Sequence, residues 1–176
     1  EEKGGALVFS RLSPDGEEGY PGALDVSVSF TLTDENALVI AYDADTDAVT
    51  PVSLTNHSYF NLDGGGDVLN QKLRIYASRY LEGNNQCCPT GAILPVADTP
   101  MDFTAGKLIG REIDTGFAQT TMVGGGYDHC YVIDRARGSS QSICAWATSD
   151  KTGISMKLYT TQPGIQLYTA NFLQDC

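Results

Sequence analysis

Two histidines occur in the chain, and the first stands in a segment that could support proton transfer. His57 belongs to the run Asn-His-Ser-Tyr-Phe-Asn-Leu, with Asn56 directly before it, and it follows an apolar stretch, residues 49–54, expected to form a strand. An imidazole titrates near neutral pH and can donate or accept a proton. A hydrogen-bonded histidine at the rim of a β-structure explains the same residue more simply, so both interpretations stay open.

A second polar group follows a run of three glycines. Residues 124–126 are glycines, and Asp128 and His129 come next, at the expected start of a strand. Loops held by a rigid scaffold often carry binding residues, and a carboxylate at such a place can accept two hydroxyl groups of a sugar. The alternative is that Asp128 caps a turn and His129 is solvated.

Two further segments carry polar groups beside Pro-Gly turns. Gln166 follows Pro163 and Gly164 between two strand-like runs, and its amide can both donate to and accept from a hydroxyl. Residues 13–22, Ser-Pro-Asp-Gly-Glu-Glu-Gly-Tyr-Pro-Gly, form an acidic loop, either at the rim of a site or plainly on the surface.

The elements that must position these residues are predicted to be strands. Residues 24–32 are apolar at every even position and polar at every odd one, which is typical of a strand with one wet face. The acidic residues 43–47 are expected to be a turn, and only residues 106–114 suggest a helical turn. The predicted class is an all-β sandwich of large antiparallel sheets, with strands at 24–32, 37–42, 49–53, 71–76, 130–133, 142–149 and 154–160.

Composition narrows the function classes. The chain has 176 residues with 11 basic and 22 acidic side chains, a net charge of −11, which disfavours nucleic acid and anionic lipid as partners. No apolar run approaches the ~20 residues needed to cross a bilayer. Five cysteines without a C-x-x-C pair indicate neither a disulfide framework nor a zinc site, so we expect reduced thiols and a cytoplasmic location. One domain, or one piece of a domain, spans residues 1–176.

Four segments, in this order along the chain, resemble the aldose 1-epimerase family: SPDGEEGYPG, NHSYFNL, GYDHCYV and TTQPGIQLYTANF. The resemblance implies a β-supersandwich that binds a free aldohexose, such as galactose or glucose, and interconverts its α and β anomers without cofactor or metal. It also implies that His57 is the catalytic acid, and that Asp128 and Gln166 hold sugar hydroxyls. Asn56, in the same motif as His57, is grouped with the substrate-binding residues.

The match also has limits. The family's general base is a glutamate in a C-terminal segment resembling E-T-Q-x-x-P-D, and a sugar-binding arginine and histidine lie in an N-terminal region; neither segment has a counterpart here. The chain therefore resembles the central part of the family, about half of a full-length member. We expect an incomplete sandwich with uncovered apolar surface. We also expect feeble turnover, since losing a general base costs about 10²–10⁴-fold in rate.

Three other functions remain open at this level. A non-catalytic carbohydrate-binding protein would retain His57, Asp128 and Gln166 for recognition alone. A hexose-6-phosphate 1-epimerase needs basic residues for phosphate, and none of the four quoted motifs contains an arginine. A purely structural β-sandwich would leave the grouping of polar residues in the loops unexplained.

Overall fold

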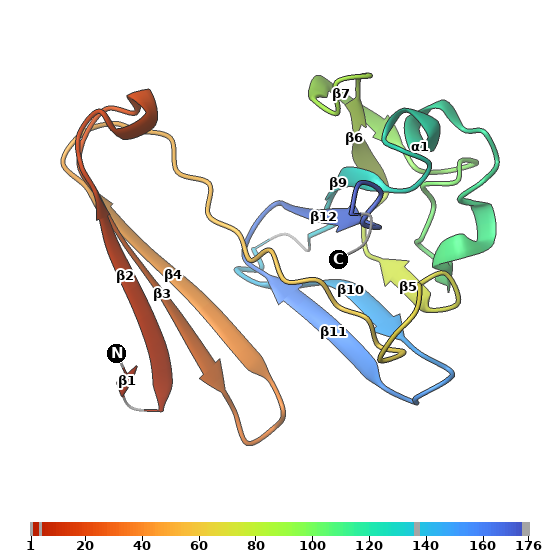
Figure 1. Cartoon of the computed structure of the whole chain (residues 1–176), viewed down its shortest axis with the longest axis horizontal. Helices are drawn as coiled ribbons and strands as arrows, with labels where there is room; N and C mark the ends of the chain where they lie inside the picture. Colours follow the sequence, from red (N-terminus) through yellow and green to blue (C-terminus); the bar gives the residue numbers. More distant parts are fainter. Residues whose placement is uncertain (1, 4, 136–137, 174–176) are drawn as a thin grey trace. The chain divides into compact units, whose positions relative to one another are not determined.

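The computed structural model describes residues 2–3, 5–135 and 138–173, which form two compact units, Glu1–Tyr59 and Phe60–Cys176 (Figure 1). Every strand pair found in the described residues is antiparallel, and the only helical elements among them are short. The predicted all-β, antiparallel class is confirmed.

Unit 1 is a sheet of four strands in the order β1-β2-β3-β4, with a short 3-10 helix η1 (Glu17–Gly19) between β2 and β3. The alternation predicted for residues 24–32 is confirmed, because it spans β3 and places its apolar residues on one face. The strands are β1 (Glu2–Lys3), β2 (Ala6–Ser13), β3 (Leu24–Leu32) and β4 (Leu38–Thr46).

Two predictions for unit 1 are wrong. The acidic residues 43–47 are not a turn, because β4 continues to Thr46 and pairs with the whole length of β3, down to Leu24↔Thr46. Residues 49–53 are not a strand, although they are rich in β-branched side chains. Pro51 has no N–H to donate to a ladder, and Val49 is 97% exposed, so no packing favours a sheet there.

Unit 2 contains two four-stranded sheets. One has the order β11-β10-β5-β8 and the other the order β12-β9-β6-β7. The expected helical turn at residues 106–114 is present as the 3-10 helix η2 (Ile109–Glu112), and α1 (Ala118–Met122) is an additional short helix. The strands are β5 (Lys72–Ile75), β6 (Arg79–Gly83), β7 (Pro89–Pro95), β8 (Lys107–Leu108), β9 (Asp128–Val132), β10 (Ser142–Thr148), β11 (Ser155–Thr160) and β12 (Gly164–Tyr168).

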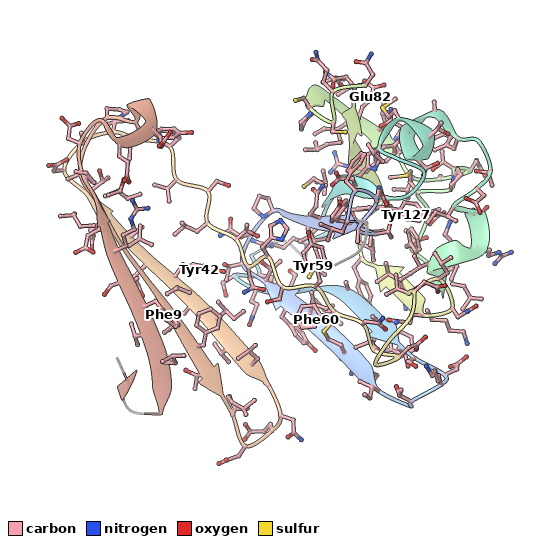
Figure 2. The ribbon with its side chains drawn as sticks, viewed as in Figure 1. Phe9, Tyr42, Tyr59, Phe60, Glu82 and Tyr127 are labelled. Carbon is pink, nitrogen blue, oxygen red and sulfur yellow. The ribbon has the colours of Figure 1, made fainter. Side chains whose placement is uncertain are left out.

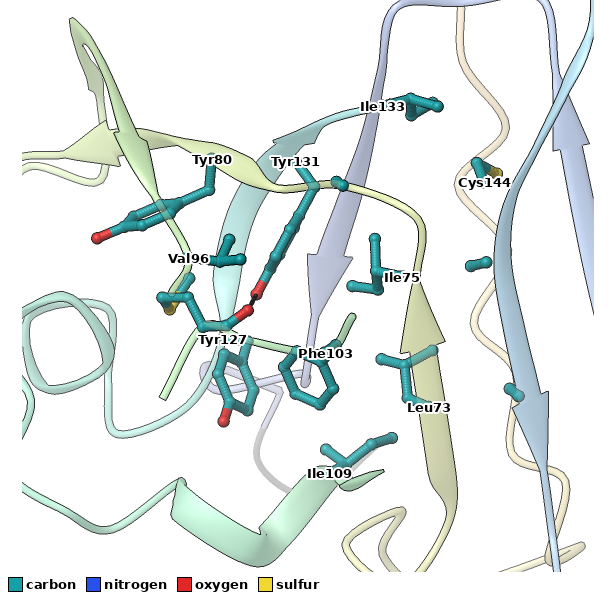
Figure 3. Close-up of a cluster of buried hydrophobic side chains, with 14 of the residues drawn as sticks. Leu73, Ile75, Tyr80, Val96, Phe103, Ile109, Tyr127, Tyr131, Ile133 and Cys144 are labelled. Atoms are coloured by element: carbon teal, nitrogen blue, oxygen red, sulfur yellow. Dashed lines mark hydrogen bonds between the residues drawn. The ribbon is translucent and has the colours of Figure 1, made fainter. Parts of the chain in front are cut away.

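The core of unit 2 is built from the inner faces of both sheets (Figure 3). Ile75 on β5 and Cys144 on β10 contribute from one sheet, and Tyr80 and Tyr131 from the other. Buried tyrosine hydroxyls need partners, and Tyr131 donates to the carbonyl of Met101 at 3.1 Å. This two-sheet core holds β9 rigidly, and β9 carries one of the predicted site residues.

No helix among the described residues is long and apolar enough to span a membrane.

Candidate functional site

Two of the predicted site residues meet on neighbouring strands of unit 2. Asp128 opens β9, and Gln166 lies in the middle of β12, opposite Cys130 and therefore diagonal to Asp128 on the same face. The Gln166 amide Nε2 donates to the Asp128 carboxylate Oδ1 over 2.7 Å. Gln166 is exposed and Asp128 is half-buried, so both remain accessible to a small ligand.

The hydrogen bond between these two side chains leaves several polar atoms free for a ligand. Because Gln166 Nε2 donates to the carboxylate, its Oε1 is available to accept from a hydroxyl. The Asp128 carboxylate has a second oxygen and further lone pairs, and charged acceptors form the stronger hydrogen bonds. The pair thus presents two acceptors and a spare N–H donor side by side, which suits vicinal hydroxyl groups.

Gly164, beside this pair, leaves room for the Cys130 side chain. A Cβ at Gly164 would lie 2.8 Å from Cys130 Sγ, on the same face as Gln166. Any larger residue at Gly164 would push against the Cys130 thiol and displace the strand edge. The Pro-Gly turn predicted from the sequence therefore also has a packing reason for its glycine.

His129 lies on the opposite face of β9 and is 2% exposed, so the alternative in which His129 is solvated is wrong. Its Nδ1 accepts from the backbone N–H of Asp128 at 3.2 Å, and its Nε2 lies 3.1 Å from Gln119 Oε1. Burial lowers the pKa of His129, and the nearby Asp128 charge partly opposes that shift. Alternation with the polar, half-buried Asp128 was the sequence signal for this burial.

The glycine run before Asp128 packs closely against Asn171. A Cβ at Gly126 would lie 2.0 Å from Asn171 Oδ1, and the Asn171 amide donates to the carbonyls of Val123 and Tyr127 at 2.7 and 3.2 Å. Thr169 Oγ1 also accepts from the Tyr127 N–H at 2.8 Å. The run of three glycines before Asp128 is therefore held in place by hydrogen bonds, and neither Thr169 nor Asn171 was identified from the sequence as its partner.

His57 and Asn56 belong to unit 1 and lie in an exposed segment without strand or helix. The Asn56 side chain accepts the backbone N–H of Ser58 at 3.0 Å, and the His57 ring lies 5.3 Å from the ring of Tyr59, centroid to centroid. The structure thus groups the predicted residues as two sets, Asn56 with His57 in unit 1 and Asp128 with Gln166 in unit 2.

The second half of the His57 motif has a structural role in unit 2. Asn61 donates to the carbonyl of Gly66 at 2.8 Å and accepts from Gln71 Nε2 at 2.8 Å. Leu62 is buried, and its carbonyl accepts from Thr152 Oγ1 at 2.7 Å. These contacts hold the two residues that follow Phe60 in place. They explain the asparagine and leucine of the motif without a role in ligand binding.

The acidic loop of residues 13–22 is held largely by its own side chains. Asp15 Oδ1 accepts the N–H of Gly22 at 2.7 Å, and Glu17 accepts from both Arg11 and Ser13. Gly16 has a φ of +81°, a conformation that glycine adopts without strain. These contacts fit a surface loop and a rim loop equally.

No group of three or more His, Cys, Asp or Glu side chains in the described part of the chain is arranged to hold a metal ion.

A family model for aldose 1-epimerase matches residues 1–176. The galactose mutarotase of Rattus norvegicus is 41% identical over 169 residues, which are 95% of this chain and 47% of that protein. The aldose 1-epimerase of Escherichia coli is 39% identical over 168 residues, 95% of this chain and 48% of that protein. The chain therefore spans about half the length of the curated relatives it matches.

Solved structures show the same likeness. A GalM/aldose epimerase homologue from C. elegans aligns with a TM-score of 0.83 and 32% identity, covering 100% of this chain and 51% of that one. The galactose 1-epimerase of Lactobacillus acidophilus aligns with a TM-score of 0.73 and 28% identity over 82% of this chain and 41% of that one.

Proposed function

The chain belongs to the aldose 1-epimerase family, and we propose that the protein binds a free aldohexose, such as galactose or glucose, and interconverts its α and β anomers. The observation that carries the proposal is the hydrogen-bonded pair of Asp128 and Gln166 on the exposed face of β9 and β12. Relatives at about 40% identity are named for this activity. The proposed reaction requires only acid–base groups of the protein, without cofactor or metal.

Asp128 and Gln166 hold the substrate in this proposal. The carboxylate accepts from two sugar hydroxyls, and Gln166 adds one acceptor and one donor beside them. The Gln166–Asp128 bond orients both groups before the sugar arrives, which reduces the cost of ordering them on binding. Asn56 supplies a further contact to the sugar.

His57 is the proposed acid. Ring opening requires a proton on the ring oxygen and removal of the proton from the C1 hydroxyl, after which the C1–O bond to the ring oxygen breaks and an aldehyde forms. The aldehyde carbon rotates and the ring closes on its other face, with both proton transfers reversed. The resemblance implies a glutamate as the complementary base, in a segment that has no counterpart among residues 1–176.

Two broader proposals accompany this function. The family match runs across both units without a break, which supports residues 1–176 as part of one epimerase domain. A cytoplasmic location agrees with free thiols at Cys87, Cys88, Cys130 and Cys144.

Sugar binding without catalysis is a second candidate, favoured by one observation. Asp128 and Gln166 form a complete pair of hydroxyl-binding side chains within unit 2, and neither depends on His57 for its position. A protein that keeps this pair but lacks a base would bind a hexose and leave its anomers unchanged.

Polarimetry tests the proposal. The rate at which freshly dissolved α-galactose reaches anomeric equilibrium is measured with the wild-type chain, with His57→Asn, and with Asp34→Asn, an exposed control in the β3–β4 hairpin. We expect a weak acceleration that His57→Asn abolishes and that Asp34→Asn leaves intact. Galactose binding without acceleration would favour the second candidate, and neither binding nor acceleration would refute both.

A further inference from the structure

The ladder between β9 and β6 ends just before the Asp128 end of β9. Only Arg79↔Val132 and Tyr80↔Tyr131 are paired, and the remainder of β6 has an irregular register with β7 between Leu81 and Gly83. On the other side of β9, the N–H of Thr169 donates to the carbonyl of Tyr127 at 3.0 Å. Successive residues of a strand direct their backbone groups to opposite sides. The Tyr127 carbonyl faces Thr169, so the Asp128 N–H faces the other side of β9, the side of β6, beyond the last paired residues of β6.

Beyond the last paired residues of β6 and β9, two side chains make the hydrogen bonds in place of the ladder. The His129 ring accepts the Asp128 N–H through Nδ1 at 3.2 Å. Gln119, on α1, accepts the N–H of Gly83 at 2.9 Å and donates to the carbonyl of the same residue at 3.1 Å. Gln119 Oε1 also lies 3.1 Å from His129 Nε2, so His129 and Gln119 join the ends of β9 and β6.

The hydrogen bonds determine which nitrogen of His129 carries the proton. Gln119 Oε1 is an oxygen, because it accepts the Gly83 N–H, and it can only accept from His129 Nε2. Nδ1 accepts the Asp128 N–H and must be bare. His129 is therefore the neutral Nε2–H tautomer, and an imidazolium would direct a second N–H at the Asp128 N–H.

We propose that His129 is a positioning residue: by accepting the Asp128 N–H it fixes the Asp128 peptide and so directs the Asp128 carboxylate at Gln166 and at the sugar. This inference rests on the proposed function for its consequence, sugar affinity, but its geometric content is independent of it. Asp128 and His129 lie on opposite faces of one strand end, so holding the His129 ring and the Asp128 N–H together fixes the rotation of that end about its axis.

A matched pair of variants separates the two hydrogen bonds of His129. In His129→Asn the short amide can still accept the Asp128 N–H but cannot reach Gln119 Oε1. In His129→Gln the longer amide can donate to Gln119 but leaves the Asp128 N–H without its acceptor. Each variant loses one bond, so a merely structural role would affect both equally.

The measurement on the two variants uses one NMR readout and one affinity. The Gln166 side-chain amide signals report the bond to Asp128, and a galactose titration gives the dissociation constant. We expect His129→Asn to keep the wild-type Gln166 signals and to bind galactose within about threefold of wild type, and His129→Gln to shift the signals and weaken binding about tenfold. Unshifted Gln166 signals in His129→Gln, or equal signal changes in both variants, would overturn the proposal.

The wild-type protein provides a test that no folding defect can disturb. The two imidazole ¹⁵N signals of His129 should report a protonated Nε2 and a bare Nδ1 at neutral pH. The opposite tautomer, or an imidazolium, would also overturn the proposal. If wild type shows the expected tautomer and His129→Gln shifts the Gln166 signals, but wild type binds no galactose, the proposed function fails while the positioning role stands.

Discussion

At the scale of single residues, Asp128 and His129 are neighbours with very different surroundings. The Asp128 carboxylate accepts sugar hydroxyl groups in the proposed site, and it already accepts the Gln166 N–H at 2.7 Å. His129, one residue further, is instead buried and neutral. Neighbouring positions on a strand thus have opposite electrostatic roles because they face opposite sides of the sheet.

The burial of His129 predicts a pH-dependent stability. Burial lowers the folded-state pKa of His129 below its ordinary 6.5, so in the window between the two values the unfolded chain binds a proton that the folded chain does not. The free energy of unfolding should therefore fall as pH decreases from 6.5 towards the folded-state pKa. Urea denaturation at several pH values measures this slope.

His129→Asn is the control for that experiment, because asparagine does not titrate. Carboxylates and His57 are common to both proteins, so the difference between the two curves isolates position 129. We expect the stability advantage of wild type over His129→Asn to shrink as the solution is acidified through this window. A difference independent of pH would contradict the buried, neutral assignment.

At the scale of elements, a strand with a clear alternation of apolar and polar residues could be predicted from the sequence. Strands and residues that depend on contacts with distant segments could not. β3 was predicted because its alternation spans nine residues. β7 was not predicted, because Pro89, Gly91 and Pro95 interrupt its pattern, and only pairing with β6 makes it a strand. Asp128 and Gln166 stood out by motif, whereas Gln119, Thr169 and Asn171 act through contacts between segments far apart in sequence.

The fastened glycine loop gives an element-scale prediction. Gly126→Ala would place a methyl group 2.0 Å from Asn171 Oδ1 and 2.4 Å from Thr169 Oγ1, so the loop before Asp128 and the segment after β12 must separate. We expect the free energy of unfolding to fall by about 2–4 kcal/mol, the range of overpacking and broken buried hydrogen bonds. Urea denaturation monitored by circular dichroism measures it.

Gly65→Ala is the matched control. Nothing lies within 4 Å of the added Cβ at Gly65, and that residue does not have a positive φ. Its stability should remain within about 0.5 kcal/mol of wild type. Similar losses in the two variants would show that the contact with Asn171 is not what holds the loop.

At the scale of the whole molecule, the two units differ in how much apolar surface they bury. Unit 2 has a core of buried tyrosines and aliphatic residues, whereas the apolar face of the unit 1 sheet is largely exposed. Leu7, Phe9, Leu32, Leu38 and Tyr42, on the same face by strand register, are 37–74% exposed, and Figure 2 labels Phe9 and Tyr42 among them. The expected uncovered apolar surface is therefore present in unit 1, and a face of this kind favours association with other apolar surfaces.

The C-terminal segment of unit 1, residues 49–59, is where we expect proteolysis to begin. Residues 49–59 lie in no strand or helix, and Val49 and Val52 are 97% and 46% exposed. Elastase, which cleaves after small apolar residues, should cut there first and release a fragment that begins at Thr50 or Ser53, because local opening is least costly where few contacts must break. Mass spectrometry of a time course identifies the fragments, and a first cut within unit 2 would contradict this division.

The central claim is that Asp128 and Gln166 hold a free aldohexose, and a galactose titration followed at the Gln166 side-chain amide signals tests it most directly. We expect galactose to shift the Gln166 amide signals of the wild-type chain in a saturable way. In Asp128→Asn the affinity should be about 10–100-fold weaker, since a hydrogen bond to a charged group contributes about 1.5–3 kcal/mol. Asp98→Asn, an exposed control with a positive φ that asparagine tolerates, should bind as wild type does. Equal affinities in wild type and Asp128→Asn, or no response at Gln166, would contradict the claim.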